Sequence, residues 1–323
     1  MVSGYIPTKP LQTYTEADPF HEFFSEWVNV YKRGTVREST LQKYIGAAEW
    51  LSGNVPHIKI GELDRPTYQR ILNTYGKKRE KSTVKVFHTL LKGAVNAFVG
   101  REYLSGDPTH GAIITGRPPK SVKEKYLSKQ HLESLIKTLE PGDEPNSDLL
   151  ILLLAKTGLR FSEALALTPA DFNFNDKRLR IVKALNYTTP EGGFKDLKND
   201  ASRRTIVIDR HICTRFREVI KAANLHRNEL IFRGCSGDRV FSSTVNRRLE
   251  TLCEKIGATP ITAHGLRHTH ASVMIYAGVS IESISKRLGH SSISTTQNVY
   301  SHIIEELENE DFQKITALLE KLG

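Results

Sequence analysis

Ionisable side chains of several types gather near the C-terminal end of the sequence, in the segments "HGLRHTHAS" from residue 264 and "LGHSSISTTQNVYSH" from residue 288. They are the side chains of His264, Arg267, His268, His270, His290 and Tyr300. Three explanations fit imidazole, guanidinium and phenol groups in one short stretch of chain. A metal site would use the imidazoles, a structural helix would tolerate them, and a site that handles an anion would use all three kinds of group.

The spacing of His264 and His268 is the first test of the metal explanation. Residues four apart share one helix face, and two imidazoles at this spacing can ligate zinc. However, no glutamate follows His264 to complete an HExxH motif, and Arg267 places a fixed positive charge beside the pair. Because this charge opposes cation binding, we expect no metal here and packing roles for His268 and His270.

Two arginines support an anion site. Arg267 lies one turn from His264 on the predicted helix, and a guanidinium offers a planar fork that fits a phosphate. In "KTGLRFSEALAL", Arg160 follows a predicted helix end, and Glu163 lies three residues later. The two could form an ordinary surface ion pair. Since the neighbours of Arg160 are apolar and an unpaired buried charge is costly, we expect Glu163 to hold it in place.

Lys198, Arg203, Arg204 and Tyr300 complete the set of candidates. Lys198 lies in the loop "FKDLKNDASRRTI" between two predicted strands. Arg203 and Arg204 open the second strand, where they contact phosphate or cap an edge strand. A phenol has a pKa near 10, so Tyr300 is a weak nucleophile unless charges or a base activate it. The alternative is that Tyr300 is a half-buried residue that only packs against its neighbours.

Two regions of different secondary structure must position these side chains. Residues 1–16 carry little apolar pattern and are expected to be extended. Residues 17–108 contain four stretches with helical spacing of apolar residues and no strand pattern, which predicts a small all-α domain. Residues 109–126 combine glycine, proline and lysine, as an interdomain linker does. Residues 127–300 predict a second domain, and residues 301–323 a C-terminal helix or tail.

The second domain is expected to be mainly helical with one small antiparallel sheet. The stretch "SDLLILLLAKTG" predicts a buried helix that ends at Gly158. "RLRIVKA" and "RRTIVID" are the strand candidates, because β-branched residues alternate or run together in them. Later helices are predicted at residues 211–223, 242–256, 264–277 and 281–288, with a final one from about residue 302. The fold class is therefore mainly α, with a mixed α/β second domain.

The charge of the chain is unevenly distributed. The formal net charge is +10, but residues 301–323 carry six acidic and two basic side chains, a net of −4, so residues 1–300 carry +14. A basic body suits a polyanionic partner, although solubility alone explains many basic proteins. The alternative to a phosphate-facing surface is a solvated helix end and linker. We expect DNA contacts from Lys77, Lys78, Arg79, Lys81, Lys85, Lys120, Lys123, Arg203 and Arg204.

The composition is that of a folded protein, with 39% hydrophobic and 25% charged residues. No apolar run approaches the roughly 18 residues that cross a bilayer, and no signal-peptide pattern is visible, so no membrane association is expected. The cysteines are Cys213, Cys235 and Cys253, an odd number with no CxxC pair. This pattern suggests no disulfide framework and favours a reducing, intracellular compartment.

Four motifs in order, "TGLRFSEALAL", "LKNDASRRTIVI", "HGLRHTHAS" and "LGHSSISTTQNVYSH", closely resemble the tyrosine recombinases, the phage-integrase family. Order and approximate spacing match over the whole second domain. The helical first domain is similar to the core-binding domain of the family, with a weaker signal. The resemblance extends to integrases of temperate phages and conjugative transposons, and it implies that the two domains form a C-shaped clamp on DNA.

The resemblance implies a role for each candidate, and no motif position departs from the family pattern. The two arginines clamp the scissile phosphate, the lysine protonates the leaving 5′ oxygen, and the tyrosine attacks. His264 assists proton transfer at the tyrosine, and His290 bonds a phosphate oxygen. The implied catalytic residues are Arg160, Lys198, His264, Arg267, His290 and Tyr300, with Glu163 as a supporting acid.

The activity that the resemblance implies is site-specific DNA recombination, for integration or excision of a mobile element such as a viral genome. Strands would be cut by type IB chemistry through a 3′-phosphotyrosyl intermediate and a Holliday junction, with no cofactor and no metal. The implied partners are double-stranded DNA with core-type sites, three further copies in a homotetramer, and accessory DNA-bending or directionality factors. The implied location is the cytoplasm of a bacterial host, at the nucleoid. Many family members carry an additional N-terminal arm-binding domain, which this chain is expected to lack or to have lost by truncation.

Two other functions remain open at this point. A type IB topoisomerase that relaxes DNA shares the chemistry, and a sequence-specific DNA-binding regulator would use the same basic surface without cutting. The acidic tail bears on this choice, because residues 303–322 have the apolar spacing of an amphipathic helix. We expect this helix to dock on a neighbouring subunit, as strand exchange by a tetramer requires. The alternative is that it packs on its own domain.

Overall fold

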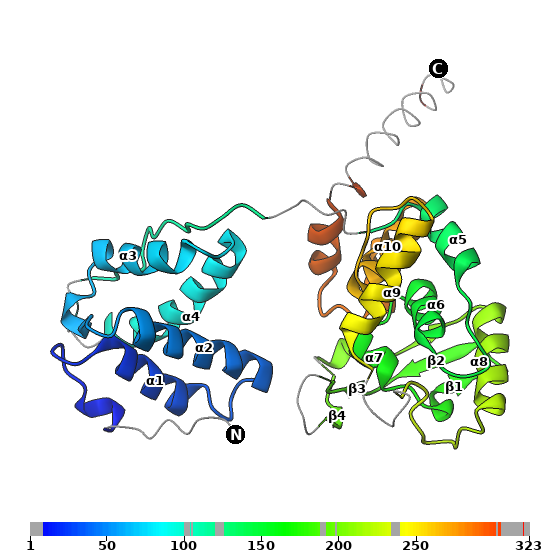
Figure 1. The fold of residues 1–323 in the computed structure, drawn as a ribbon, viewed down its shortest axis with the longest axis horizontal. Coiled ribbons are helices and arrows are strands. Elements are labelled where there is room, and N and C mark those ends of the chain that lie inside the picture. Colours follow the sequence, from blue (N-terminus) through cyan, green and yellow to red (C-terminus); the bar gives the residue numbers. More distant parts are fainter. Residues whose placement is uncertain are drawn as a thin grey trace. The chain divides into compact units, whose positions relative to one another are not determined.

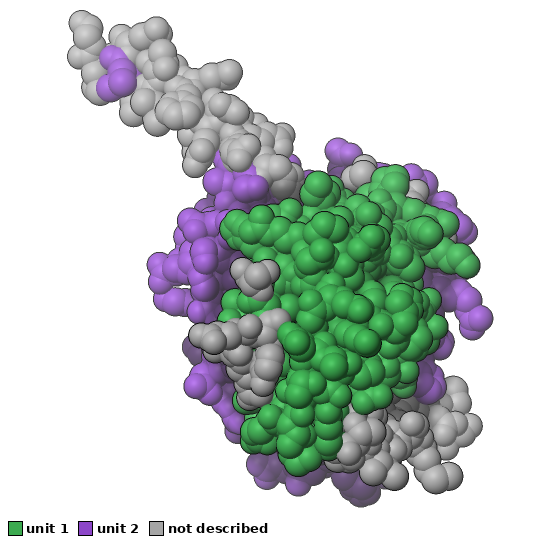
Figure 2. All heavy atoms as spheres, turned by 90° about the vertical axis from the view of Figure 1, so that its left-hand side faces the viewer, with its two compact units in different colours: residues 1–122 green, residues 123–323 purple. Residues whose placement is uncertain are grey.

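The chain forms two compact units, Met1–Val122 and Lys123–Gly323, which Figures 1 and 2 show. The computed structural model describes residues 9–99, 104, 106–119, 126–187, 192–197, 199–233, 240–301, 303, 304 and 319. The boundary between the units lies inside the segment predicted as a linker. Each unit has a hydrophobic core of its own. As predicted, the chain is mainly helical with small antiparallel sheets.

Unit 1 contains the helices α1 (Phe20–Tyr31), α2 (Glu38–Asn54), α3 (Arg65–Gly76) and α4 (Lys81–Val99), preceded by the short 3-10 turn η1 (Leu11–Thr13) and interrupted by another, η2 (Ile60–Glu62). Helix α3 shows why these segments are helical. The Asp64 carboxylate accepts a hydrogen bond from the Thr67 backbone N–H, and Pro66 occupies the first turn, where its missing N–H costs nothing. The core is rich in aromatic rings, and Tyr75 stacks on Phe87 at 3.8 Å between ring centroids.

The first part of the predicted linker packs against unit 1. The Ile113 N–H donates to the Gln69 side chain, and the Lys81 N–H donates to the Arg117 carbonyl oxygen. Gly116 has a φ of +130° and lies so close to the backbone of Lys81 that a side chain would not fit. The described residues 109–119 are therefore held by α3 and α4. Lys120 and Lys123 lie outside the described residues.

Unit 2 has small antiparallel sheets and, among its described residues, several helices. They are α5 (Lys129–Thr138), α6 (Ser147–Thr157), α7 (Phe161–Leu165), α8 (Arg210–Ala222), α9 (Ser242–Lys255), α10 (Ala263–Tyr276) and α11 (Ile281–Leu288), with the 3-10 turns η3 (Pro169–Asp171) and η4 (Asp200–Ser202). Helix α6 is buried along most of its length and packs against α10 and α9. It ends at Gly158 in the left-handed conformation, as the sequence predicts.

The two segments predicted as strands pair in the structure. Strands β2 (Arg178–Ile181) and β5 (Arg204–Val207) are antiparallel neighbours, with Leu179 opposite Ile206, and β1 (Phe172–Asn173) adds to the other edge of β2. A second sheet, the hairpin of β3 (Ala184–Leu185) and β4 (Phe194–Lys195), was not expected. These strands have two residues each, which is too short for an alternating pattern to mark them.

The segment that carries Tyr300 is helical from residue 293 to residue 301, earlier than the start predicted near residue 302. Its sequence is polar, and only Thr296, Tyr300 and Ile303 of this region are buried. One buried residue per turn is a narrow stripe, which explains why the apolar spacing failed to indicate a helix. Tyr300 and Ile303 pack with Ala271, Ile275 and the α11 side chains Ile284 and Leu288. Most of the predicted tail helix lies outside the described residues.

No helix among the described residues is both long enough and apolar enough to cross a membrane.

Candidate active site

Helix α10 supplies three of the side chains at the site, His264, Arg267 and His268. The Thr262 hydroxyl caps this helix by accepting a hydrogen bond from the Gly265 N–H. Arg267 points into the protein and is 3% exposed. Its Nη1 donates to the carbonyl oxygen of Gly158 at 2.8 Å, and its Nη2 donates to that of Leu288 at 2.7 Å. The guanidinium is therefore fixed by the C-terminal ends of α6 and α11.

Arg160 immediately precedes α7 and approaches the same two helix ends. Its Nη1 donates to Glu163 Oε1 at 2.7 Å, as predicted, and its Nη2 donates to the carbonyl oxygen of Gly289 at 2.9 Å. Glu163 is 1% exposed. Burial raises the pKa of its carboxyl, but the charges and hydrogen bonds of Arg204 and Arg160 outweigh burial and hold the pKa below its ordinary value. Glu163 is thus an ionised, buried anchor for Arg160.

Arg204 opens strand β5, as predicted, and its side chain is directed into the protein. Its Nη2 donates to Glu163 Oε2 at 2.9 Å, its Nε donates to the carbonyl oxygen of Arg287, and its Nη1 donates to Glu163 and to the Ser202 carbonyl oxygen. The side chain is 7% exposed. Because these internal contacts occupy all its nitrogens, the structure favours a positioning role for Arg204 over the phosphate contact that the sequence suggests. Arg203, beside it, is 56% exposed.

His290 follows a sharp turn at the end of α11. Gly289 there has a φ of +71°, and a side chain at this position would meet Arg204 and the backbone near Ser202. The Nδ1 atom of His290 is hydrogen-bonded to the Thr296 hydroxyl at 2.8 Å. Burial and then the charges of Arg267 and Arg160 lower the pKa of His290 to about 4, so its imidazole is neutral at pH 7. The same causes, in the same order, lower the pKa of His264.

Tyr300 closes the site from the helical segment 293–301. Only 2% of its surface is exposed, and its hydroxyl is hydrogen-bonded to Nδ1 of His268 at 3.0 Å. Burial raises the pKa of Tyr300 to about 12, which the nearby Arg267 charge offsets only in part. The phenol is consequently protonated at neutral pH and needs a base, a charge or both before it can act as a nucleophile.

These side chains line one cavity of about 280 Å³. Five of the six predicted catalytic residues are among its walls, and Lys198, the sixth, lies outside the described residues. Guanidinium groups and neutral imidazoles around a small polar cavity suit a tetrahedral anion, since the arginines supply charge and the histidines supply directed hydrogen bonds. The lining residues are Arg160, Asn199, His264, Arg267, His268, His290, Ser291, Thr295, Val299 and Tyr300.

His268, for which the sequence suggested only a packing role, lines this cavity and contacts the Tyr300 hydroxyl. A sequence signal existed, because positions 264, 267 and 268 are spaced to share one helix face. The packing role expected for His270 is confirmed. Its Nδ1 is hydrogen-bonded to the Ala155 carbonyl oxygen, Arg287 donates to its Nε2, and burial lowers its pKa to about 3.

The predicted DNA contacts of unit 1 remain predictions with a consistent geometry. Lys77, Lys78, Lys81 and Lys85 are exposed where α3 ends and α4 begins. Arg79 is half-buried, because its guanidinium lies over the Tyr75 ring at 4.1 Å from the centroid. A cation that stacks on a ring retains its charge while its position is fixed.

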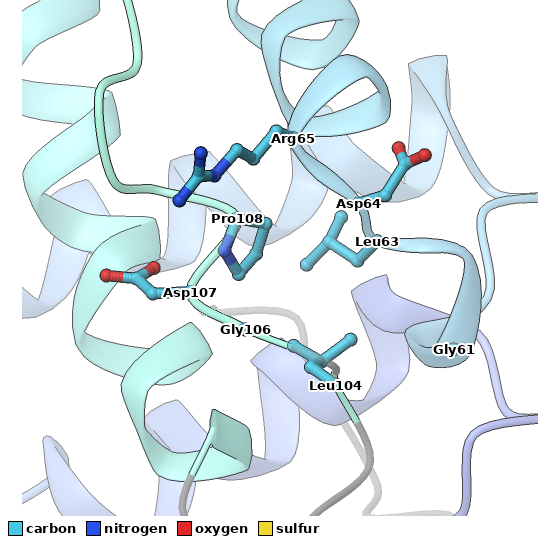
Figure 3. A pocket seen from close by; sticks show the side chains of 8 residues that line it. All are labelled: Gly61, Leu63, Asp64, Arg65, Leu104, Gly106, Asp107 and Pro108. Carbon is cyan, nitrogen blue, oxygen red and sulfur yellow. The ribbon is translucent and has the colours of Figure 1, made fainter.

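Unit 1 also contains a pocket of about 350 Å³ that Figure 3 shows. Both of its carboxylates accept hydrogen bonds from nearby residues: Asp64 caps α3, and Asp107 accepts from the backbone N–H and the hydroxyl of Thr109. None of the candidate catalytic residues lines it, so we regard it as structural. Its lining residues are Gly61, Leu63, Asp64, Arg65, Leu104, Gly106, Asp107 and Pro108.

Comparison with known proteins gives consistent matches. The model of the phage integrase family matches residues 125–306. A XerC-like tyrosine recombinase of Caldanaerobacter subterraneus is 26% identical over 91% of this chain and 80% of its own length. The integrase of Staphylococcus phage L54a is 32% identical over 51% of this chain and 50% of its own length. This chain thus spans four fifths of one relative and half of the other.

Solved structures show the same fold at low sequence identity. The Tn1549 transposon integrase in complex with transposon right end DNA aligns with a TM-score of 0.76 at 19% identity, over 92% of this chain and 99% of that one. A lambda integrase dimer bound to a core site aligns with a TM-score of 0.62 at 15% identity, over 87% of this chain and 94% of that one. With the family match over more than half of its length and the motifs gathered around one cavity, the chain belongs to the phage integrase family of tyrosine recombinases, which are enzymes of site-specific recombination.

Proposed function

We propose that this protein cuts and rejoins double-stranded DNA at specific sites through a covalent bond between Tyr300 and a 3′ phosphate. The observation that carries the proposal is the position of the Tyr300 hydroxyl in the wall of a cavity that Arg160 and Arg267 also line. A nucleophile next to two fixed guanidinium groups suits attack on a phosphodiester, because negative charge grows on the phosphoryl oxygens in the transition state.

Each predicted catalytic residue has a task in this reaction. Arg160 and Arg267 bind the non-bridging oxygens and are held ready by the helix ends that accept their hydrogen bonds. His290, which is neutral, adds a hydrogen bond to a phosphate oxygen, and His264 assists proton transfer at the tyrosine, as the sequence motif implies. Lys198 protonates the 5′ oxygen as it leaves; this assignment rests on its sequence motif alone. The phosphotyrosyl bond retains the energy of the broken phosphodiester, so a 5′ hydroxyl from another strand can rejoin the DNA without a nucleotide cofactor.

The wider assignments are proposals of the same kind. Residues 17–108 would serve as the core-binding domain and residues 127–300 as the catalytic domain. Four copies would assemble on two DNA sites, and strand exchange would pass through a Holliday junction. Integration or excision of a mobile element is favoured by the relatives, which include a phage integrase and the fold of a transposon integrase. A DNA-relaxing topoisomerase would use the same chemistry without assembling copies.

Covalent trapping tests the proposal. A nicked core-site duplex loses the short strand downstream of the cut, so the 3′-phosphotyrosyl product accumulates and migrates more slowly on a denaturing gel. The native protein should form this adduct, and Tyr300→Phe should form none. The variant should bind the same DNA with nearly native affinity, because it loses one buried oxygen and keeps every DNA contact. An adduct with the Phe variant would place the nucleophile elsewhere. No adduct with the native protein on any cognate site would favour a regulator that binds without cutting.

A further inference from the structure

The only described hydrogen bond of the Tyr300 hydroxyl is with His268. The Nδ1 and hydroxyl atoms are 3.0 Å apart, and the ring centroids are 5.8 Å apart. His268 is half-buried on α10 and directly follows Arg267, while Tyr300 comes from the segment 293–301. Both positions are set by packing, because Tyr300 is fixed against α10 and α11 in a small hydrophobic cluster. The contact therefore belongs to the folded site and does not depend on an exposed loop.

The reaction requires removal of a proton at this atom. With a pKa of about 12, roughly one Tyr300 side chain in 10⁵ is ionised at pH 7, so an unassisted phenolate would limit the rate. A general base must lie within hydrogen-bonding distance of the proton that it removes. His268 meets this condition before DNA arrives.

The other two histidines of the cavity are less suited to the task. His264 lies one turn earlier on α10 and touches His268 edge to face, with ring centroids 4.9 Å apart, but no hydrogen bond in the described part of the chain joins it to Tyr300. In His290 the Nδ1 atom already contacts Thr296, and burial with the nearby arginine charges lowers its pKa to about 4.

We infer that His268 is the general base of strand cleavage: its Nδ1 accepts the Tyr300 proton as the phenol attacks phosphorus, and it returns the proton on religation. The inference rests on the proposed function and deepens it, since it moves proton transfer at the tyrosine from His264 to His268. The tautomer required carries its hydrogen on Nε2 and leaves Nδ1 as the acceptor.

The step balances in charge and atoms. The Tyr300 oxygen forms a bond to phosphorus while the bond from phosphorus to the 5′ oxygen breaks. The electron pair of the broken bond stays on the 5′ oxygen, which takes a proton from the general acid, while the phenol proton moves to His268 and makes it an imidazolium. Arg267 would repel this new charge in the free protein. In the complex, the anionic phosphodiester lies between the cations and reduces the repulsion.

The decisive variant is His268→Asn, because the asparagine side-chain oxygen can accept the phenol hydrogen bond but cannot take the proton. General-base catalysis contributes about 10²-fold or more, so single-turnover cleavage on the nicked duplex should slow at least about 100-fold at pH 7. The pH profile should also change. The native rate should level off once the base is neutral, whereas the variant rate should continue to rise about tenfold per pH unit, as hydroxide replaces the base. His264→Asn, the matched change one turn earlier, should lower the rate and retain the native plateau.

A second measurement separates proton removal from positioning. Fluorinated tyrosines at position 300 have phenols of lower pKa. With His268 present, lowering this pKa should change the cleavage rate little, because the base already shares the proton. In the His268→Asn background, the same fluorination should raise the cleavage rate at least tenfold and so recover part of the loss.

The outcomes distinguish this inference from the proposed function. If the native protein forms no adduct, the proposed function fails. If it does, and His268→Asn binds DNA normally and cleaves with the native rate and pH profile, only the inference is overturned. It is also overturned if fluorination rescues His264→Asn and not His268→Asn. If His268→Asn fails to bind DNA, the fluorotyrosine series in the native background decides alone. A cleavage rate that rises tenfold for each unit by which the phenol pKa is lowered would then refute the role of His268.

Discussion

Replacing Glu163 by glutamine is the most direct test of how the arginines are held. The change keeps the size of the side chain and removes one negative charge at a position that is 1% exposed. Glu163 Oε1 accepts from Arg160 at 2.7 Å, and Oε2 accepts from Arg204 at 2.9 Å and from the Arg160 backbone N–H at 3.0 Å. Glutamine has one oxygen for these donors, and its amide group turns two hydrogens toward a guanidinium.

The expected loss follows from the burial of the partners. Removing one member of a buried ion pair typically costs about 3–5 kcal/mol, because the other charge is left without compensation. Arg204 is 7% exposed and should suffer this in full, whereas the 25% exposure of Arg160 lets solvent screen part of its charge. We therefore expect Glu163→Gln to lower the free energy of unfolding by the lower end of this range, about 3 kcal/mol. For a unit of roughly 200 residues, about 2–4 °C of Tm is lost per kcal/mol, so unit 2 should melt about 6–12 °C lower.

The pH dependence of stability should change in a defined direction. The Glu163 pKa in the folded protein lies below its ordinary value of 4.5. Such a group contributes stability above the unfolded pKa and loses it as the pH falls through the folded pKa. The native protein should therefore lose this contribution below about pH 4.5, and Glu163→Gln should lack it at every pH. The difference in Tm between the two proteins should be constant at neutral pH and shrink under acid.

Calorimetry of the full chain measures this, with cleavage of the nicked duplex as the functional assay. The matched control is Glu282→Gln, since Glu282 pairs with Lys286 four residues later on α11, and both side chains are exposed. The control should melt and cleave like the native protein. Glu163→Gln should also cleave slowly, because Arg160 loses the group that orients it. A Glu163→Gln protein that melts within about 2 °C of the native one and cleaves at the native rate would show that the buried carboxylate does not hold the arginines.

The remaining predictions concern Lys198 as the general acid, the effect of removing metal ions, and the contact that orients His290. Lys198→Ala should slow cleavage of ordinary DNA far more than cleavage of DNA with a 5′-bridging sulfur, which needs no proton to leave; equal slowing would assign the acid to another residue. Cleavage should persist in EDTA, because Arg160 and Arg267 provide the positive charge at the phosphate; loss on chelation that magnesium restores would contradict this. Thr296→Val removes the hydroxyl that contacts Nδ1 of His290, and we expect about a fivefold lower cleavage rate, since a lost hydrogen bond of about 1 kcal/mol frees the ring to turn; a native rate would mean that packing alone orients His290.

Much of the fold could be predicted because its signals are local. The start of α3 is marked by Asp64 and Pro66, and the end of α6 by Gly158, all within one turn of the element that they delimit. The pairing of β2 with β5 also followed from two β-branched runs. The two-residue strands β3 and β4 and the polar helical segment 293–301 lacked such signals, since their order comes from contacts with distant parts of the chain.

The same division applies to the site. The pair of Arg160 and Glu163 spans three residues and could be inferred from the sequence. The Arg204 contact with Glu163 spans 41 residues, and the hydrogen bond between His268 and Tyr300 spans 32. Such pairs form only once the sheet register and the α10 packing are set. Sequence motifs predicted five of the side chains that line the cavity, but not that Arg204 contacts Glu163 or that His268 contacts the phenol.

The electrostatics of Arg267 explain why the site is suited to a phosphodiester. In the described part of the chain, no carboxylate lies within ion-pair distance of Arg267, and its hydrogen bonds are to the carbonyl oxygens of Gly158 and Leu288. Burial and then the charge of Arg160 lower its pKa to about 9. The C-terminal ends of α6 and α11 provide only partial negative charge, so the guanidinium is held in position but not neutralised. A phosphate that enters the cavity supplies the missing charge, and it meets donors whose orientation is already fixed. Binding energy that would otherwise be used to orient flexible cations is therefore available for the transition state.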